Sequence, residues 1–213
     1  MNDIGRAWIY AGRHSDDFTS AITRHLELVA IAMAIGIVVC VPLGVLTSRS
    51  RIASVTIING FNALRVIPSL AILFVMLPIT GLSLTSALIA LTILALPPIL
   101  INTDAAFRTI NPAIREAATG MGMSRGEVLR RIEFPLALPV MLAGIRIATV
   151  EVIASATLAA FIGGGGLGVF ITRGFALYDP AILLVGAIPV AVLAFLAEAG
   201  MGFLQRVVQP PTR

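Results

Sequence analysis

The chain has 213 residues, of which 58% are hydrophobic and 12% are charged, and its mean hydropathy is +0.98. Soluble domains average about 45–50% apolar and about 25% charged residues, so this composition indicates a membrane protein. The chain has 15 arginines and no lysine, which excludes a P-loop lysine, a Schiff-base lysine and a lysine nucleophile. The net charge is +4, but the arginines are scattered between apolar stretches, which argues against nucleic acid as a partner.

Residues 1–24 are mixed and polar, without the apolar core that follows the first basic residues of a signal peptide. We expect a short external segment at the membrane interface, anchored by Trp8 and Tyr10. His14 and His25 stand apart from any cysteine or carboxylate pattern that binds metal ions. Interfacial or surface positions are therefore expected for both histidines.

Five stretches are apolar and long enough to cross a bilayer, which takes about 20 residues. We expect spans at Leu28–Ser48, Ile57–Leu77, Leu82–Ile101, Pro135–Ile162 and Pro180–Gln205. The start of the first span stays open, because Phe18–Leu26 can extend it. Cys40 lies within that span and is expected to be a buried, small apolar residue. The predicted fold class is an all-α polytopic membrane protein, with a transmembrane domain at residues 25–208 and a tail at 209–213.

The only long polar interval between the spans runs from Asn111 to Pro135. Asn111 can cap a helix and Pro112 suits its first position. Gly120 and Gly122 are expected to end this helix, since glycine tolerates the left-handed conformation found at helix C-termini. The interval therefore predicts a first short polar helix.

A second helix is predicted at Arg125–Arg131, after the capping box formed by Ser124 and Glu127. Pro135 and Pro139 bracket the entry to the fourth span. Two capped polar helices between membrane spans indicate a docking element rather than a connector.

The spacing within this interval resembles the EAA loop of type 1 ABC importer permeases. The matching positions are Glu116, Ala117, Ala118, Gly122, Ile132 and Pro135. The family usually has leucine before the proline, where this chain has Phe134. The resemblance implies that residues 111–135 form a cytoplasmic two-helix coupling loop between spans three and four, with these six residues as its ATPase-coupling positions.

Several partners follow from that resemblance. The loop would sit in a groove of a cytoplasmic ABC ATPase dimer and transmit its closure to the pore. ATP and Mg would bind to the ATPase, so this chain itself would be no enzyme and hold no cofactor. A second permease copy or a paralogue, an extracytoplasmic solute-binding protein and the lipid bilayer are the other expected partners, in a bacterial inner membrane.

Later residues resemble the permeases of osmoprotectant importers, which carry glycine betaine, choline or carnitine. The similar stretches are Ile67–Leu70, Ala156–Ile162, Arg173–Gly174 and Asp179–Leu183. The resemblance implies a solute with a quaternary ammonium group. Permeases for methionine, phosphonates and sulfonates share the same scaffold and remain alternatives.

Arginine counting indicates the orientation, because cytoplasmic loops are rich in arginine. With the 111–135 interval inside, the N-terminus lies outside and the C-terminus inside. The outside then holds Arg6, Arg13, Arg24 and Arg173, and the inside holds Arg49, Arg51, Arg65, Arg108, Arg115, Arg125, Arg130, Arg131, Arg206 and Arg213.

Ionisable residues in spans are costly and usually face a cavity or a partner. Arg65 and Glu151 are therefore candidates for the solute path. Arg146 lies about 140° from Glu151 around an ideal helix, so a direct pair between them is not expected. Arg146 is expected to snorkel or to bond to a neighbouring helix.

Two other classes of membrane protein are alternatives to a permease. An intramembrane enzyme would need a nucleophile–base pair or a metal cluster, and the spans contain no HExxH or GxSxG motif. An autonomous secondary carrier is favoured by an inverted repeat, which the sequence does not show. Gly163, Gly165 and Gly168 match GxGxxG, but without a preceding strand they indicate a sharp external turn rather than a nucleotide site.

Overall fold

The computed structural model describes residues 2–209, and every regular element within them is a helix. The order is α1 (Asp3–Arg13), α2 (Ser15–Thr47), α3 (Arg51–Val66), α4 (Ser69–Thr80), α5 (Leu84–Arg108), α6 (Pro112–Gly120), α7 (Arg125–Val128), the π-helical turn η1 (Leu129–Glu133), α8 (Phe134–Ser155), the 3₁₀ segment η2 (Ala156–Ile162), α9 (Gly168–Ala176) and α10 (Pro180–Val208). Apart from Gln209, the predicted tail at 209–213 lies outside the described residues.

Four helices are long and apolar enough to cross a membrane, and a bent pair makes a fifth candidate. The four are α2, α5, α10 and the continuous helix from Arg125 to Ile162. The prediction of an all-α membrane protein with about five spans is confirmed. α2 begins at Ser15, so the boundary drawn at residue 24 falls inside a helix.

The second predicted span, Ile57–Leu77, is not one straight helix. It consists of α3 and α4, which meet at an angle of 93°. Ile67 between them has extended backbone angles, with φ −76° and ψ 123°. Proline disfavours helical geometry in the preceding residue, so Pro68 accounts for the break.

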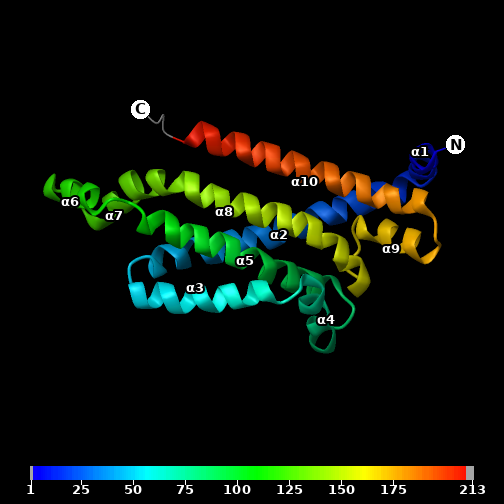
Figure 1. The fold of residues 1–213 in the computed structure, drawn as a ribbon, viewed down its shortest axis with the longest axis horizontal. Helices are drawn as coiled ribbons and strands as arrows, with labels where there is room; N and C mark the ends of the chain where they lie inside the picture. The colour runs from blue at the N-terminus through cyan, green and yellow to red at the C-terminus, as the bar shows by residue number, and fades with distance from the viewer. Residues whose placement is uncertain (1, 210–213) are drawn as a thin grey trace.

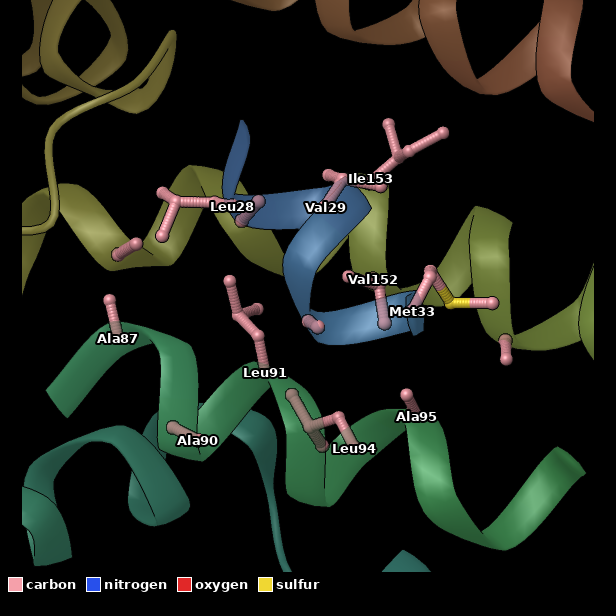
Figure 2. Packing of buried hydrophobic residues seen from close by; sticks show 14 of the residues in the cluster. Leu28, Val29, Met33, Ala87, Ala90, Leu91, Leu94, Ala95, Val152 and Ile153 are labelled. Atoms are coloured by element: carbon pink, nitrogen blue, oxygen red, sulfur yellow. The ribbon is translucent and has the colours of Figure 1, made fainter. Parts of the chain in front are cut away.

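The core lies where α2, α5 and α8 pack together (Figure 2). Leucine, valine and methionine side chains of α2 face a row of alanines and leucines on α5. Small residues let membrane helices approach each other closely. Gly36 and Gly44 of α2 have this effect as well as the alanines of α5. A Cβ atom on Gly44 would lie 2.6 Å from Cβ of Thr103 on α5. Cys40 is fully buried, as predicted.

The two ends of the bundle differ (Figure 1). α6 and α7 lie at one end, where α10 also finishes, and α1 and α9 lie at the opposite end. Both the polar interval and the last helix therefore reach the same end, which is the relative placement that the sequence predicts.

Candidate functional site

The polar interval begins with the helix that the sequence predicts. The Asn111 side chain accepts a hydrogen bond of 3.0 Å from the backbone N–H of Ala113, and Pro112 occupies the first turn. α6 ends at Gly120, and Gly122 follows with φ +84°. This left-handed conformation favours glycine, so the turn between the two polar helices depends on that residue.

α6 exposes an acidic residue and a small one side by side. Glu116 and Ala117 are exposed, whereas Ala118 is only 2% exposed and holds α6 against the molecule. Among residues 2–209, Glu116 has no ion pair within 4.0 Å. The nearby Arg115 is engaged by another carboxylate instead. The Glu116 carboxylate is consequently available to a partner.

The second polar helix starts as predicted and ends differently. Ser124 and Glu127 form both bonds of the capping box. The helix does not end at Arg131, because α7 passes through η1 into α8 without a break. Proline lacks a backbone N–H and its ring crowds the preceding turn. The wider π turn immediately before Pro135 accommodates both effects. Ile132 is half-buried within η1, and Pro135 is exposed in the first turn of α8.

Glu133 is a buried carboxylate at this end of the bundle, with 2% of its side chain exposed. Its carboxylate accepts hydrogen bonds of 2.8 and 2.5 Å from the guanidinium of Arg49 and one of 2.5 Å from Nε of Arg115. Arg115 Nη2 also donates to the carbonyl oxygen of Phe107 at 2.5 Å. The hydrogen bond with Glu133 raises the pKa of Arg49, so that this guanidinium stays charged. Charge-assisted bonds of this kind are the stronger ones in proteins.

These bonds connect four parts of the chain. Arg49 belongs to the link between α2 and α3, Arg115 to α6, Phe107 to the end of α5, and Glu133 to the entry into α8. α6 is therefore tied to α5 and η1 through Arg115, and to the link between α2 and α3 through Glu133. We call Arg49, Arg115 and Glu133 the Glu133 cluster.

The two candidates for the solute path line one cavity of about 170 Å³. Arg65 lies just before the break between α3 and α4, and Glu151 projects from α8. Neither side chain has an ion-pair partner within 4.0 Å among residues 2–209. Arg65 is one of the arginines expected on the inside. In the structure Arg65 lies at the opposite end of α3 from Arg51, and its side of the membrane stays a prediction. At about 1.5 Å per residue, the two arginines are about 21 Å apart along the helix.

Arg146 and Glu151 do not pair, as their angular separation predicts. Arg146 instead bonds to Glu198 of α10, a neighbouring helix, as one of the two predicted alternatives. The pair joins α8 to α10.

His25 is not at the surface, which corrects the prediction for this residue. It is fully buried, and its Nε2 lies 3.1 Å from the carbonyl oxygen of Ile153 on α8. The side chain sits beneath the glycine turn, because a Cβ atom on Gly166 would be 3.3 Å from its Nδ1. Since α2 begins before residue 24, His25 lies inside a helix that packs into the core.

The family model for binding-protein-dependent transport system inner membrane components matches residues 36–210. That range includes the second part of α2, all the later spans, the polar interval and the Glu133 cluster. The chain belongs to this family. It is therefore a permease subunit of an ABC importer in the inner membrane. The members of this permease family are not catalytic.

Curated relatives of the permease are similar over most of its length. It is 41% identical over 186 residues to the choline transport system permease protein OpuBB of Bacillus subtilis (strain 168), covering 87% of this chain and 86% of that protein. It is 42% identical over 187 residues to the carnitine transport permease protein OpuCB of Listeria monocytogenes, covering 88% of this chain and 86% of that protein. The resemblance to osmoprotectant permeases is thus confirmed.

A solved structure shares the permease's fold. A chain of the MetNI methionine ABC transporter in an inward-facing conformation matches with a TM-score of 0.80 and 24% identity, covering 91% of this chain and 96% of that one. At this identity the match shows the fold alone.

Sequence reasoning did not identify Glu133 as part of the site. The available signal was a lone carboxylate that follows two arginines and directly precedes an apolar run. Its main partner, Arg49, is 84 residues away, so only the fold reveals the contact.

Proposed function

We propose that this permease couples a separate cytoplasmic ABC ATPase dimer to a solute path through α6, α7 and the Glu133 cluster. The observation that supports this most is an exposed Glu116 with no ion pair among residues 2–209, next to an Arg115 that bonds to Glu133 and to the carbonyl oxygen of Phe107. The Glu116 carboxylate can contact a partner. Arg115 ties the same short helix to the end of α5 and, through Glu133, to the entry of α8 and the link after α2. ATP and Mg bind to the ATPase in this proposal.

Glu116, Ala117, Ala118, Gly122, Ile132 and Pro135 are the coupling positions. Glu116 presents a carboxylate and Ala117 a small methyl group to the ATPase groove. Ala118 is buried and anchors α6. Gly122 sets the angle between α6 and α7. Ile132 and Pro135 lie where α7 becomes α8, so movement of the loop passes into a continuous helix of 38 residues.

The proposed cargo is a small compatible solute with a quaternary ammonium group, such as glycine betaine, carnitine or choline. Relatives named for choline and carnitine transport support it, at 41% and 42% identity. A permease for methionine, phosphonates or sulfonates is the alternative. We further propose that a second permease copy or paralogue completes the path, that a solute-binding protein delivers the cargo, and that the N-terminus lies outside.

Reconstitution tests this proposal. The permease would be co-expressed with a partner ABC ATPase and a solute-binding protein from the same organism, placed in proteoliposomes and supplied with ATP. We expect saturable uptake of radiolabelled glycine betaine, carnitine or choline that requires all components. Uptake of methionine or a phosphonate alone would reject the cargo, and ATP-independent uptake by the permease alone would reject coupling to an ATPase.

A further inference from the structure

α3, which forms one half of the bent second span, carries a row of polar side chains that is unusual for a membrane helix. Thr56, Asn59 and Asn62 are all exposed, and they recur at every third position up to Arg65. Residues three apart on a helix are neighbours, so the four form one winding stripe. Exposed polar groups are costly in hydrocarbon and usually face a water-filled cavity or a protein partner. The stripe therefore marks a polar route along α3.

This polar stripe ends at the cavity that Arg65 shares with Glu151. Within the described part of the chain, neither charge makes an ion pair or a hydrogen bond to another side chain. Two opposite charges that share a cavity without neutralising each other are complementary to a ligand with both signs of charge. The cavity of about 170 Å³ is below the range of about 300–1,000 Å³ typical of drug-sized ligands, which restricts it to a small solute.

The cavity also lies far from the end of the bundle that holds the polar interval. Glu151 is about 26 Å along α8 from Phe134, and Arg65 is about 21 Å along α3 from Arg51, at about 1.5 Å per residue. Both distances are measured from the end that holds the polar interval, and the hydrocarbon layer is about 30 Å thick. In the proposed orientation, the two charges thus lie toward the far side of the membrane, where an imported solute enters.

We infer that this cavity is a transient subsite for a small zwitterion that carries a carboxylate and a quaternary ammonium group. Arg65 contacts the carboxylate by charge-assisted hydrogen bonds. Glu151 attracts the ammonium by charge alone, because a quaternary nitrogen has no N–H to donate. This inference rests on the proposed function and adds a preference for glycine betaine or carnitine over choline, which has no carboxylate.

The rest of the lining favours passage over tight retention. Quaternary ammonium groups are held tightly by aromatic cages. The residues that line this cavity include no aromatic side chain and are mostly aliphatic, with two serines, Ser69 and Ser155. A subsite on a path has to release its solute, and this lining suits a weak site.

The test compares maximal uptake rates of glycine betaine and choline in proteoliposomes that hold the complete system. At saturating solute the binding protein is fully loaded, so the maximal rate reports the permease. We expect Arg65→Gln to lower the glycine betaine rate about 10-fold and to spare the choline rate, as loss of one charge-assisted hydrogen bond predicts. Glu151→Gln should lower both rates, and Arg65→Lys should restore part of the glycine betaine rate.

Arg51→Gln is the matched control, because Arg51 is an exposed arginine at the other end of α3. ATPase co-purification and ATPase stimulation by the binding protein verify that each variant assembles. The subsite would be overturned if Arg65→Gln changed the maximal uptake rates of glycine betaine and choline by the same factor. It would also be overturned if Arg65→Gln gave the same two rates as Arg51→Gln. The proposed function would stand in either case. Absence of any coupled uptake by the wild-type system would instead reject the proposed function.

Discussion

At the scale of single residues, Glu133 concentrates the electrostatics of the loop end of the bundle. Its carboxylate is 2% exposed, whereas Arg49 and Arg115 retain 43% and 31% exposure. Removing one member of a buried pair leaves its partner uncompensated, which costs more than the pair contributes. The partial exposure of the arginines reduces that penalty.

Glu133→Gln should therefore destabilise the permease by about 1.5–3 kcal/mol, the range for a hydrogen bond to a charged group. The expected result is a lower unfolding temperature in detergent and weaker ATPase association. Glu27→Gln is the control, since Glu27 forms an exposed pair with Arg24, and such pairs contribute about 0–1 kcal/mol. Equal unfolding temperatures for the two variants would show that the Glu133 cluster does not stabilise this end.

Residue roles could be predicted from sequence where the contact is local. The capping box joins residues three apart, and the cap at Asn111 joins residues two apart. Glu133 and Arg49 are 84 residues apart, and His25 meets an oxygen 128 residues away. No periodicity or spacing reports contacts of that range, so these residues were overlooked or misplaced.

At the scale of helices, the contact between α2 and α5 sets the centre of the fold. Gly44 approaches Thr103 so closely that a Cβ atom would meet two carbon atoms of that side chain at 2.6 and 2.7 Å. Both residues are inside packed helices, which limits how far either backbone can shift.

Gly44→Ala should destabilise the permease by about 1–3 kcal/mol, the cost of overpacking a filled core. Gly60→Ala is the control, because a Cβ atom on Gly60 of α3 meets nothing within 4 Å. Thermal unfolding of both purified variants would measure the difference. A Gly44→Ala unfolding temperature at or above that of Gly60→Ala would contradict close packing at this crossing.

The helices themselves were largely predictable, and their irregularities were not. Long uncharged runs indicated the spans, while the break at Pro68 and the π turn before Pro135 were missed. A proline can break a helix or be absorbed by it, and the outcome depends on the neighbouring packing. The same residue type therefore ends α3 in one place and lies inside a continuous helix in the other.

At the scale of the whole molecule, the proposed orientation places the two ends of the bundle on opposite sides of the membrane. Ser124 is exposed in the polar interval, and Leu177 is 62% exposed beside α9 at the other end. With Cys40→Ser as background, Ser124→Cys should react with a membrane-impermeant thiol reagent only from the cytoplasm. Leu177→Cys should react only from outside. Reaction of both from one side would contradict the topology.

The central claim is that the 111–135 interval couples the permease to an ATPase. Gly122 has φ +84°, a conformation that costs a residue with a β-carbon about 1–2 kcal/mol. Gly122→Leu should therefore tilt α7 relative to α6 while leaving the spans and their insertion intact. Gly126→Ala is the control, because Gly126 is helical and a Cβ atom on it meets nothing within 4 Å.

The decisive measurement is ATPase co-purification together with solute uptake for Gly122→Leu and Gly126→Ala at matched membrane abundance. We expect Gly122→Leu to lose most of its ATPase co-purification and most of its solute uptake. We expect Gly126→Ala to retain both properties. Wild-type ATPase association and uptake in Gly122→Leu would contradict a coupling role for this interval.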